Sequence, residues 1–121
     1  MAGSQLLVHT IQDATVVNFR QASILDSAII DSIAQELYAL IDEKAVRRLV
    51  LDFANVKFLS SQALGVLITV KKKADAIKGV ILIAAMKEDL QRVFKIMNLQ
   101  KLFSFYPTEH EALASFDIFT S

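Results

Sequence analysis

The hydrophobic positions near the N-terminus change from a strand pattern to a helix pattern. Two short runs rich in β-branched residues, Leu6–Ile11 and Thr15–Arg20, are separated only by residues 12–14, which is typical of a β-hairpin. From Asp26 to Lys44 the apolar side chains recur with a helical period, and polar side chains fall on the opposite side. The apolar stripe consists of Ile29, Ile30, Ile33, Leu37, Leu40 and Ile41. We therefore expect a hairpin followed by an amphipathic helix.

The middle of the chain has the pattern of a strand, a helix and a second strand. Leu49–Phe53 and Gly79–Ala85 are short apolar runs, and Ser61–Ile77 between them has the length of a helix. The second run is apolar at every position after Gly79, which is typical of a strand covered on both faces. This order predicts a βαβ unit with parallel strands and a right-handed crossover.

The C-terminal part continues the alternation of helix and strand. We expect a third helix over Lys87–Asn98, a short strand over Phe103–Tyr106 and a terminal helix to Phe116. The third helix should bury Leu90, Val93, Phe94 and Met97. Thr108 and Glu111 have the spacing of a capping box at the start of the terminal helix. The predicted fold class is α/β: a mixed β-sheet, mainly of parallel βαβ units after an N-terminal hairpin, with about four helices.

Composition limits the class of protein further. The chain has 121 residues, of which 54% are hydrophobic, so we expect one domain over residues 1–121 with a large core. Its longest uncharged stretch, residues 58–70, is shorter than the roughly 20 residues that a membrane-spanning helix needs. The chain has no cysteine, and no basic and apolar signal segment begins it. We therefore expect a soluble cytoplasmic protein without membrane insertion or a disulfide.

Charge and side-chain chemistry argue against nucleic-acid binding and catalysis. Thirteen basic and thirteen acidic residues give a formal net charge of zero, whereas a nucleic-acid partner requires a basic face. His9 and His110 have no carboxylate or histidine nearby at metal-ligand spacing, and the three glycines form no phosphate-binding loop. No serine has an identifiable base to activate it. We therefore expect no enzymatic activity, no metal and no cofactor.

Two adjacent serines mark the most informative segment. Ser60 and Ser61 lie between the strand Leu49–Phe53 and the next helix, where the first backbone N–H groups of the helix lack partners. One serine is explained as an N-cap, which contributes about 1 kcal/mol. A second interpretation is regulatory, because a phosphate on Ser61 would add about 1.5 to 2 negative charges at the positive end of the helix dipole. The folded state should tolerate this charge, while a protein packed over the serine would not.

The helix that follows the serines carries no charge over residues 63–70. Such a helix is either covered on all sides or presents an apolar face to another protein. The core side should comprise Leu64, Leu67 and Ile68, and the side available to a partner Val66 and Thr69. Gly65 costs about 1 kcal/mol in a helix relative to alanine, so we expect a close approach there, either to the sheet or to a partner.

These residues resemble the STAS domain of bacterial anti-sigma-factor antagonists. That family typically carries a Phe/Met-Asp-Ser-Ser/Thr-Gly-Leu-Gly-Val-Leu segment, which residues 58–67 match in part. The strand Leu49–Phe53, the pair Leu25 and Asp26 before the first helix, and Gly79 before the next strand also fit. The resemblance therefore covers nearly the whole chain.

The resemblance implies a phosphorylation switch. In the antagonists, a partner that is both anti-sigma factor and serine kinase phosphorylates the first serine after the motif's Asp. The unphosphorylated form binds that partner and frees the sigma factor. The matching phosphoacceptor is Ser61, while Ser60 stands in place of the Asp, Gln62 in place of the second Ser/Thr and Ala63 in place of the Gly. The implied partner is an anti-sigma-factor serine kinase.

Asp26 resembles the family's acidic residue at the rim of the same surface, and it is equally suited to cap the first helix. The predicted partner-binding residues are Asp26, Ser60, Ser61, Gln62, Val66 and Thr69. One alternative is a non-switching STAS subunit of a larger signalling or transporter assembly, which the altered motif favours more than a complete motif would. Another is small-molecule or nucleotide binding at the C-terminal ends of the parallel strands. A weak homodimer is compatible with each of these functions.

Overall fold

A computed structural model describes residues 5–119, and its centre is a five-stranded sheet in the order β1-β2-β4-β6-β7. The strands are β1 (Leu6–Ile11), β2 (Ala14–Phe19), β4 (Arg48–Asp52), β6 (Val80–Ala84) and β7 (Ser104–Tyr106). β1 and β2 form the predicted antiparallel hairpin, and every other neighbouring pair is parallel. The predicted mixed, mainly parallel sheet is confirmed.

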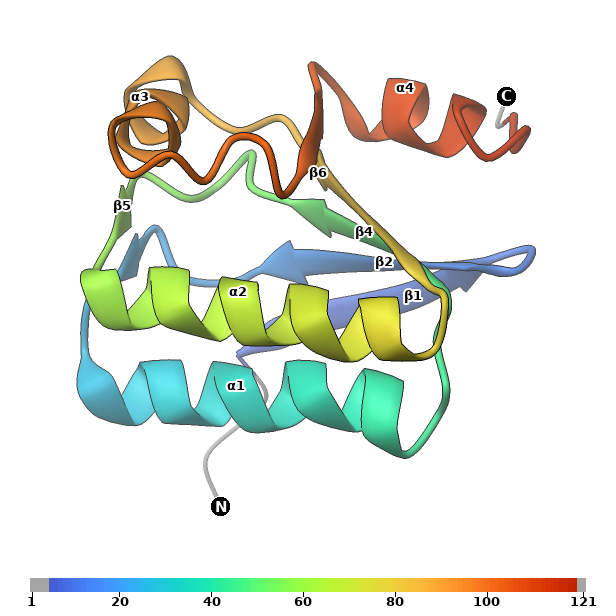
Figure 1. The fold of residues 1–121 in the computed structure, drawn as a ribbon, viewed down its shortest axis with the longest axis horizontal. Coiled ribbons are helices and arrows are strands. Elements are labelled where there is room, and N and C mark those ends of the chain that lie inside the picture. The colour runs from blue at the N-terminus through green and yellow to red at the C-terminus, as the bar shows by residue number, and fades with distance from the viewer. Residues whose placement is uncertain (1–4, 120–121) are drawn as a thin grey trace.

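Helices cover both faces of this sheet (Figure 1). They are α1 (Ser27–Asp42), α2 (Ser61–Ala76), α3 (Glu88–Ile96) and α4 (Glu109–Ala114). α1 and α2 lie side by side on one face, and α4 lies on the other. None of the helices within residues 5–119 is both long and apolar enough to cross a membrane.

The sheet separates a large core from a small one, and β6 contributes to both. Ile81 and Ile83 belong to the large core on the side of α1 and α2, whereas Leu82 and Ala84 belong to the small core beneath α4. Because successive side chains of a strand point to opposite faces, a strand covered on both sides must be apolar at every position. This explains the continuous apolar run of the sequence.

A second, two-stranded sheet was absent from the sequence prediction. It pairs β3 (Ser23–Ile24) with β5 (Phe58–Leu59) in parallel. Two residues per strand are too few for an alternating pattern to be recognised. The segment between β4 and α2 is thus an ordered strand at the end of the core, where Ile24 is buried and Leu59 is half-buried.

The prediction for the third helix was partly wrong. Leu90 and Phe94 are buried as expected, but Val93 and Met97 are exposed. Phe94 lies edge-on to Phe103 and Phe105, with ring centroids 5.8 and 5.6 Å apart. α3 therefore packs on the core through a narrow row of side chains. The apolar side chains on either side of this row are exposed to solvent.

The terminal helix is also shorter than predicted, because α4 ends at Ala114 instead of Phe116. Its start is as predicted, since the Thr108 hydroxyl accepts a hydrogen bond from the Glu111 N–H over 3.1 Å. At the other end Asp117 has a left-handed backbone with φ of 62°, and the Ile118 N–H donates to the Leu113 carbonyl. This reversal turns Ile118 into the small core.

Candidate functional site

α1 and α2 begin side by side at the same end of the molecule (Figure 1). The two-stranded sheet produces this alignment, because β3 runs directly into the start of α1 and β5 into the start of α2. The Ser60 N–H donates to the Ile24 carbonyl over 3.1 Å. The pairing thus brings together the two helix N-caps, Asp26 and Ser60, which the sequence placed far apart.

Ser60 is the structural serine of the pair. Its hydroxyl accepts a hydrogen bond from the Ala63 N–H over 3.1 Å, and its backbone is extended, as an N-cap requires. The side chain is half-buried. The capping function expected for one of the two serines is therefore carried out by Ser60.

Ser61 is the first residue of α2 and is exposed to solvent. Its hydroxyl makes no hydrogen bond within residues 5–119. No acidic side chain lies in the first turn of α2, so the positive end of the helix dipole is not already neutralised by the turn itself. Ser61 thus presents a free hydroxyl beside a helix terminus.

Asp26 caps α1 and remains exposed. One carboxylate oxygen accepts hydrogen bonds from the Ala28 N–H over 2.8 Å and from the Ile29 N–H over 3.2 Å. The capping interpretation is confirmed. Contact between Asp26 and a partner protein stays a prediction.

Gln62 joins the two helices. Its side-chain N–H donates to the Asp31 carboxylate over 3.2 Å, and both residues are exposed. This bond between α1 and α2 places a carboxylate and an amide next to Ser61. The surface around the serine is therefore polar and carries the negative charges of Asp26 and Asp31.

The solvent side of the N-terminal part of α2 consists of small and polar residues. Ser61, Gln62 and Gly65 are exposed, and half-buried Thr69 donates its hydroxyl to the Gly65 carbonyl over 3.1 Å. A methyl group built onto Gly65 would meet no atom within 4 Å. The expected close approach of Gly65 to the sheet is therefore wrong, and approach of a partner stays a prediction. We call Ser61, Gln62, Gly65 and Thr69 the α2 stripe.

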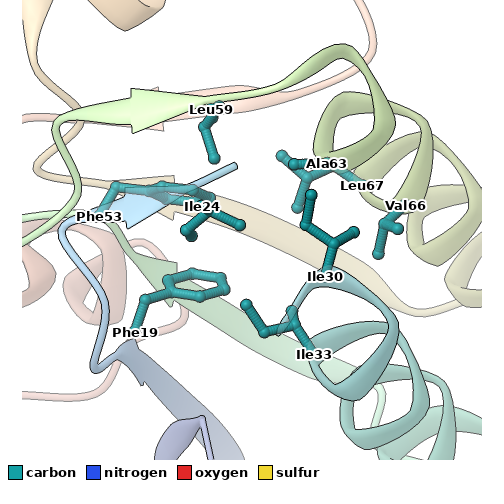
Figure 2. Close-up of a pocket in the computed structure, with 9 residues that line it drawn as sticks. All are labelled: Phe19, Ile24, Ile30, Ile33, Phe53, Leu59, Ala63, Val66 and Leu67. Atoms are coloured by element: carbon teal, nitrogen blue, oxygen red, sulfur yellow. The ribbon is translucent and has the colours of Figure 1, made fainter. Parts of the chain in front are cut away.

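Val66 lies in the seam between the helices and not on the α2 stripe. Figure 2 shows it with Ile30 and Ile33 of α1 around a small apolar cavity. The cavity is lined by Phe19, Ile24, Ile30, Ile33, Phe53, Leu59, Ala63, Val66 and Leu67. Its volume of about 10 Å³ is at most enough for a single water molecule. This cavity has no room for a cofactor, so we look for interactions of this end of the molecule at its surface.

Two large apolar side chains flank the serines and were missed as site residues. Leu25, directly after β3, is 53% exposed, and Phe58 in β5 is 56% exposed. Leu25 and Phe58 together form an apolar rim beside the α2 stripe, and exposed large apolar side chains that lie together mark sites of protein interaction. The signal in the sequence was the apolar pair Phe58 and Leu59, of which only one member is needed for the core.

A polar cluster lies on the opposite face of the sheet, and the sequence did not predict it. Asp52 at the end of β4 is only 7% exposed, and Glu109 begins α4. The His9 Nε2 atom lies 3.8 Å from a Glu109 carboxylate oxygen. Burial raises the pKa of the Glu109 carboxyl above 4.5, and the hydrogen bond and negative charge of Asp52 raise it further. A hydrogen bond with Asn18 and the charge of His9 lower the same pKa.

An open cleft of about 500 Å³ adjoins this cluster at the C-terminal ends of β2 and β4. It is lined by Leu7, Asn18, Phe19, Arg20, Asp52, Ala54 and Asn55. This is the position at which open α/β sheets bind ligands, but no glycine-rich turn supplies phosphate-binding amides there. Residues 5–119 contain no group of three or more His, Asp or Glu side chains that could hold a metal ion.

Comparisons with known proteins agree with this architecture. The family model of the STAS domain matches residues 5–112. BtrV of Bordetella bronchiseptica, assigned as an anti-sigma factor antagonist, is 29% identical over 93 residues, which are 77% of this chain and 79% of BtrV.

Two solved structures have the same fold. An anti-sigma-factor antagonist (STAS) domain protein of Planctomyces limnophilus is 22% identical with a TM-score of 0.81, covering 94% of this chain and 98% of the other. The Bacillus cell fate determinant SpoIIAA, solved in its phosphorylated form, is 17% identical with a TM-score of 0.73, covering 92% and 98%.

Proposed function

Because the chain belongs to the STAS domain family, we propose that it is a cytoplasmic protein-binding module of the anti-sigma-factor antagonist type, switched by phosphorylation of Ser61. Its partner is an anti-sigma factor that is also a serine kinase. The chain itself is not an enzyme and uses no cofactor. The observation that carries the proposal is the exposed, unbonded hydroxyl of Ser61 at the start of α2.

The start of α2 suits a phosphate on Ser61. The N–H groups of the first turn have no acceptor within the helix, apart from the Ala63 N–H that Ser60 binds. A phosphate supplies three acceptor oxygens and about 1.5 to 2 negative charges, which the helix dipole favours. The modified chain therefore stays folded, with its charge concentrated at one point of the surface.

The partner covers the α2 stripe and the apolar rim of Leu25 and Phe58. Burial of the two apolar side chains provides affinity, and the acidic side chains Asp26 and Asp31 select a partner with hydrogen-bond donors or basic residues at the margin. Phosphorylation places a bulky, strongly hydrated group where the partner packs closely, and the cost of desolvating and accommodating that group releases the partner. Ser60 contributes through the helix cap and Val66 through the seam between α1 and α2.

The acceptor assignment is tested with the cognate kinase and ATP, followed by intact-mass measurement. The wild type should gain one phosphate, and Ser61→Ala should gain none. Ser60→Asp is the matched control, because aspartate replaces the N-cap and removes the neighbouring hydroxyl. This variant should still gain one phosphate. Phosphate on Ser61→Ala, or none on the wild type, contradicts the assignment.

The switch itself is tested by Ser61→Asp. Partner affinity should fall at least about tenfold, equivalent to 1.4 kcal/mol, while the free energy of unfolding should change by no more than about 0.5 kcal/mol. A collapse of the thermal midpoint would instead make Ser61 a structural residue.

A second candidate function keeps the fold without the switch. Ser60 in place of the motif's Asp and Gln62 in place of its second Ser/Thr are departures from a switching motif. They favour a constitutive STAS subunit of a larger signalling or transporter assembly. Isolation of the chain from cells in a stable complex, unphosphorylated under all conditions, supports this candidate and excludes the switch.

A further inference from the structure

The five-stranded sheet has two edges that differ in length and in protection. β7 at one edge has three residues, and a short edge strand is one way in which proteins avoid pairing with other chains. The other usual protections are charged side chains, prolines and bulges. β1 at the second edge has six residues without a charged Lys, Arg, Asp or Glu side chain and without a proline, and its register with β2 runs without a bulge. The β1 edge is therefore long and unprotected.

Alternate residues of β1 direct their backbone groups away from β2. The Gln5 carbonyl accepts a hydrogen bond from the Arg20 N–H over 3.1 Å, so position 5 faces β2. Because hydrogen-bonded and non-hydrogen-bonded pairs alternate along an antiparallel ladder, positions 7, 9 and 11 face β2 as well. Val8 and Thr10 therefore point their N–H and C=O groups outwards. No strand within residues 5–119 pairs with this outer side of β1.

The middle of β1 is also uncovered on both faces of the sheet, since residues 7–10 are all exposed. Leu6 belongs to the large core, so Val8 shares the face of α1 and α2, and Leu7 lies on the opposite face. Leu7 is 53% exposed and Val8 is 45% exposed. A strand added at this edge would cover apolar surface on both faces and pair with the outward backbone groups.

We propose that two copies of the chain associate by antiparallel pairing of their β1 strands across a two-fold axis at His9. In this register Val8 of each copy lies opposite Thr10 of the other copy, and each such pair exchanges two backbone hydrogen bonds. Leu7 of each copy lies opposite Ile11 of the other, on the face of α4. The backbone groups that the contact needs are those that β2 leaves free.

The occupant of the edge is a second copy because this contact closes on itself. A two-fold contact uses the same surface of both partners, so it occupies both β1 edges and leaves only the short β7 edges of the joined sheets. Self-pairing also brings no like-charged Lys, Arg, Asp or Glu side chains together, because β1 has none. One six-residue strand from each copy is a small contact beside the roughly 1,200 to 2,000 Å² of a stable interface. The dimer is therefore weak and depends on concentration.

Sedimentation velocity of the full chain from micromolar to millimolar concentration measures this association. The runs are made at slightly alkaline pH, where histidine side chains are ordinarily uncharged. The wild type should shift from monomer to dimer as its concentration rises, without larger species. Val8→Lys should raise the Kd at least about tenfold, because the two lysines would be diagonal neighbours across the axis and because lysine protects a free edge.

Val80→Lys is the matched control. Val80 is 47% exposed, but it lies in β6, an interior strand without a free edge. This variant should keep the Kd of the wild type. Circular dichroism checks that both lysine variants are folded.

The register is tested separately with single cysteines, because the chain contains none of its own. His9→Cys should form a disulfide-linked dimer under mild oxidation. Residues opposite each other in a non-hydrogen-bonded pair have Cα atoms about 4.5 Å apart, which a disulfide can span. Leu7→Cys should form little of this product, because its two copies would be offset by about 13 Å along the strands.

Three results overturn the proposal. The first is a chain that stays monomeric up to millimolar concentration, which would leave the edge to a strand of another protein. The second is a dimer whose Kd is the same in Val8→Lys and the wild type. The third is disulfide formation by Leu7→Cys that equals or exceeds that by His9→Cys. None of these measurements involves the kinase partner, so their outcome is independent of the proposed switch at Ser61.

Discussion

Two neighbouring serines of identical chemistry have different environments, and the difference is one residue of helix register. Ser60 is the last extended residue, so its hydroxyl turns back onto the Ala63 N–H. Ser61 already has helical geometry, and its hydroxyl leaves the helix towards solvent. The cap function of Ser60 and the proposed phosphoacceptor function of Ser61 are therefore separable by substitution. If α2 began one residue later, Ser61 would take the position of the N-cap.

Gly65 is the residue at which stability and binding should diverge. It lies inside α2, is exposed, and has open space where a methyl group would be. Gly65→Ala should raise the free energy of unfolding by about 0.5 to 1 kcal/mol, because alanine restricts the unfolded chain and favours the helix. The same methyl group projects from the α2 stripe and should weaken partner binding.

Gly79 provides the control for this substitution. A methyl group there would lie 3.1 Å from the Arg47 carbonyl oxygen and 3.2 Å from the Arg47 Cα, both backbone atoms that cannot move aside. Gly79→Ala should therefore destabilise the protein. Chemical denaturation of the two variants measures both effects. A destabilised Gly65→Ala would show that α2 is strained at this point, and unchanged partner affinity would remove Gly65 from the interface.

At the scale of elements, the β3–β5 pair shapes the end of the molecule that we propose as the binding surface. It aligns the starts of α1 and α2 and leaves Leu25 and Phe58 outside the core. Substitution of Phe58 by serine should reduce partner affinity by 2 kcal/mol or more, as large apolar residues at interface centres do. The free energy of unfolding should change little, because most of the Phe58 side chain is already in solvent.

Ile96 in α3 is the matched control, since it is an apolar side chain that is 78% exposed and lies outside the proposed interface. Calorimetric titration of the partner should give a large loss for Phe58→Ser and none for Ile96→Ser. If both substitutions weakened partner binding equally, the interface would lie elsewhere or the binding would not be specific.

The long elements were predictable from the sequence, and the short ones were not. α1 is determined by a hydrophobic periodicity over 16 residues and β6 by a continuous apolar run, so the buried side of α1 and the double covering of β6 could be predicted. β3 and β5 depend on backbone pairing between segments more than thirty residues apart, which leaves no periodic signal. The same reason hid the Asp52 and Glu109 pair, since its members come from a strand and a helix far apart in the chain. Ser61 was predictable because its position is local, directly after a helix cap.

At the scale of the whole molecule, one sheet joins two cores of unequal size. The large core holds Leu37 at 0% exposure, and the small core beneath α4 holds Leu113 at 2%. β4 and β6 supply side chains to both cores, so loss of either core removes support from the same strands. Chains of this length usually unfold in one cooperative transition. We therefore propose that residues 1–121 form a single cooperative domain.

Each core contains one natural reporter of its unfolding. The chain has two tyrosines and no tryptophan, with Tyr38 packed against the large core and Tyr106 against the small one. Tyr106→Phe leaves only the large-core signal, and Tyr38→Phe leaves only the small-core signal. Thermal unfolding followed by tyrosine fluorescence should give the same midpoint in the two variants. The effect of each substitution on the overall midpoint is measured by circular dichroism and subtracted before the comparison.

Leu37→Ala and Leu113→Ala extend this test by weakening one core at a time. Each should lose about 2 to 5 kcal/mol, the range for removing a buried leucine side chain, while Leu102→Ala, at a site 40% exposed, should lose much less. Because the strands are shared, damage to the small core must lower the midpoint reported by Tyr38 as well. If Leu113→Ala instead lowered only the Tyr106 midpoint, α4 and its core would be a separate unfolding unit. The sheet would then not transmit stability between its two faces.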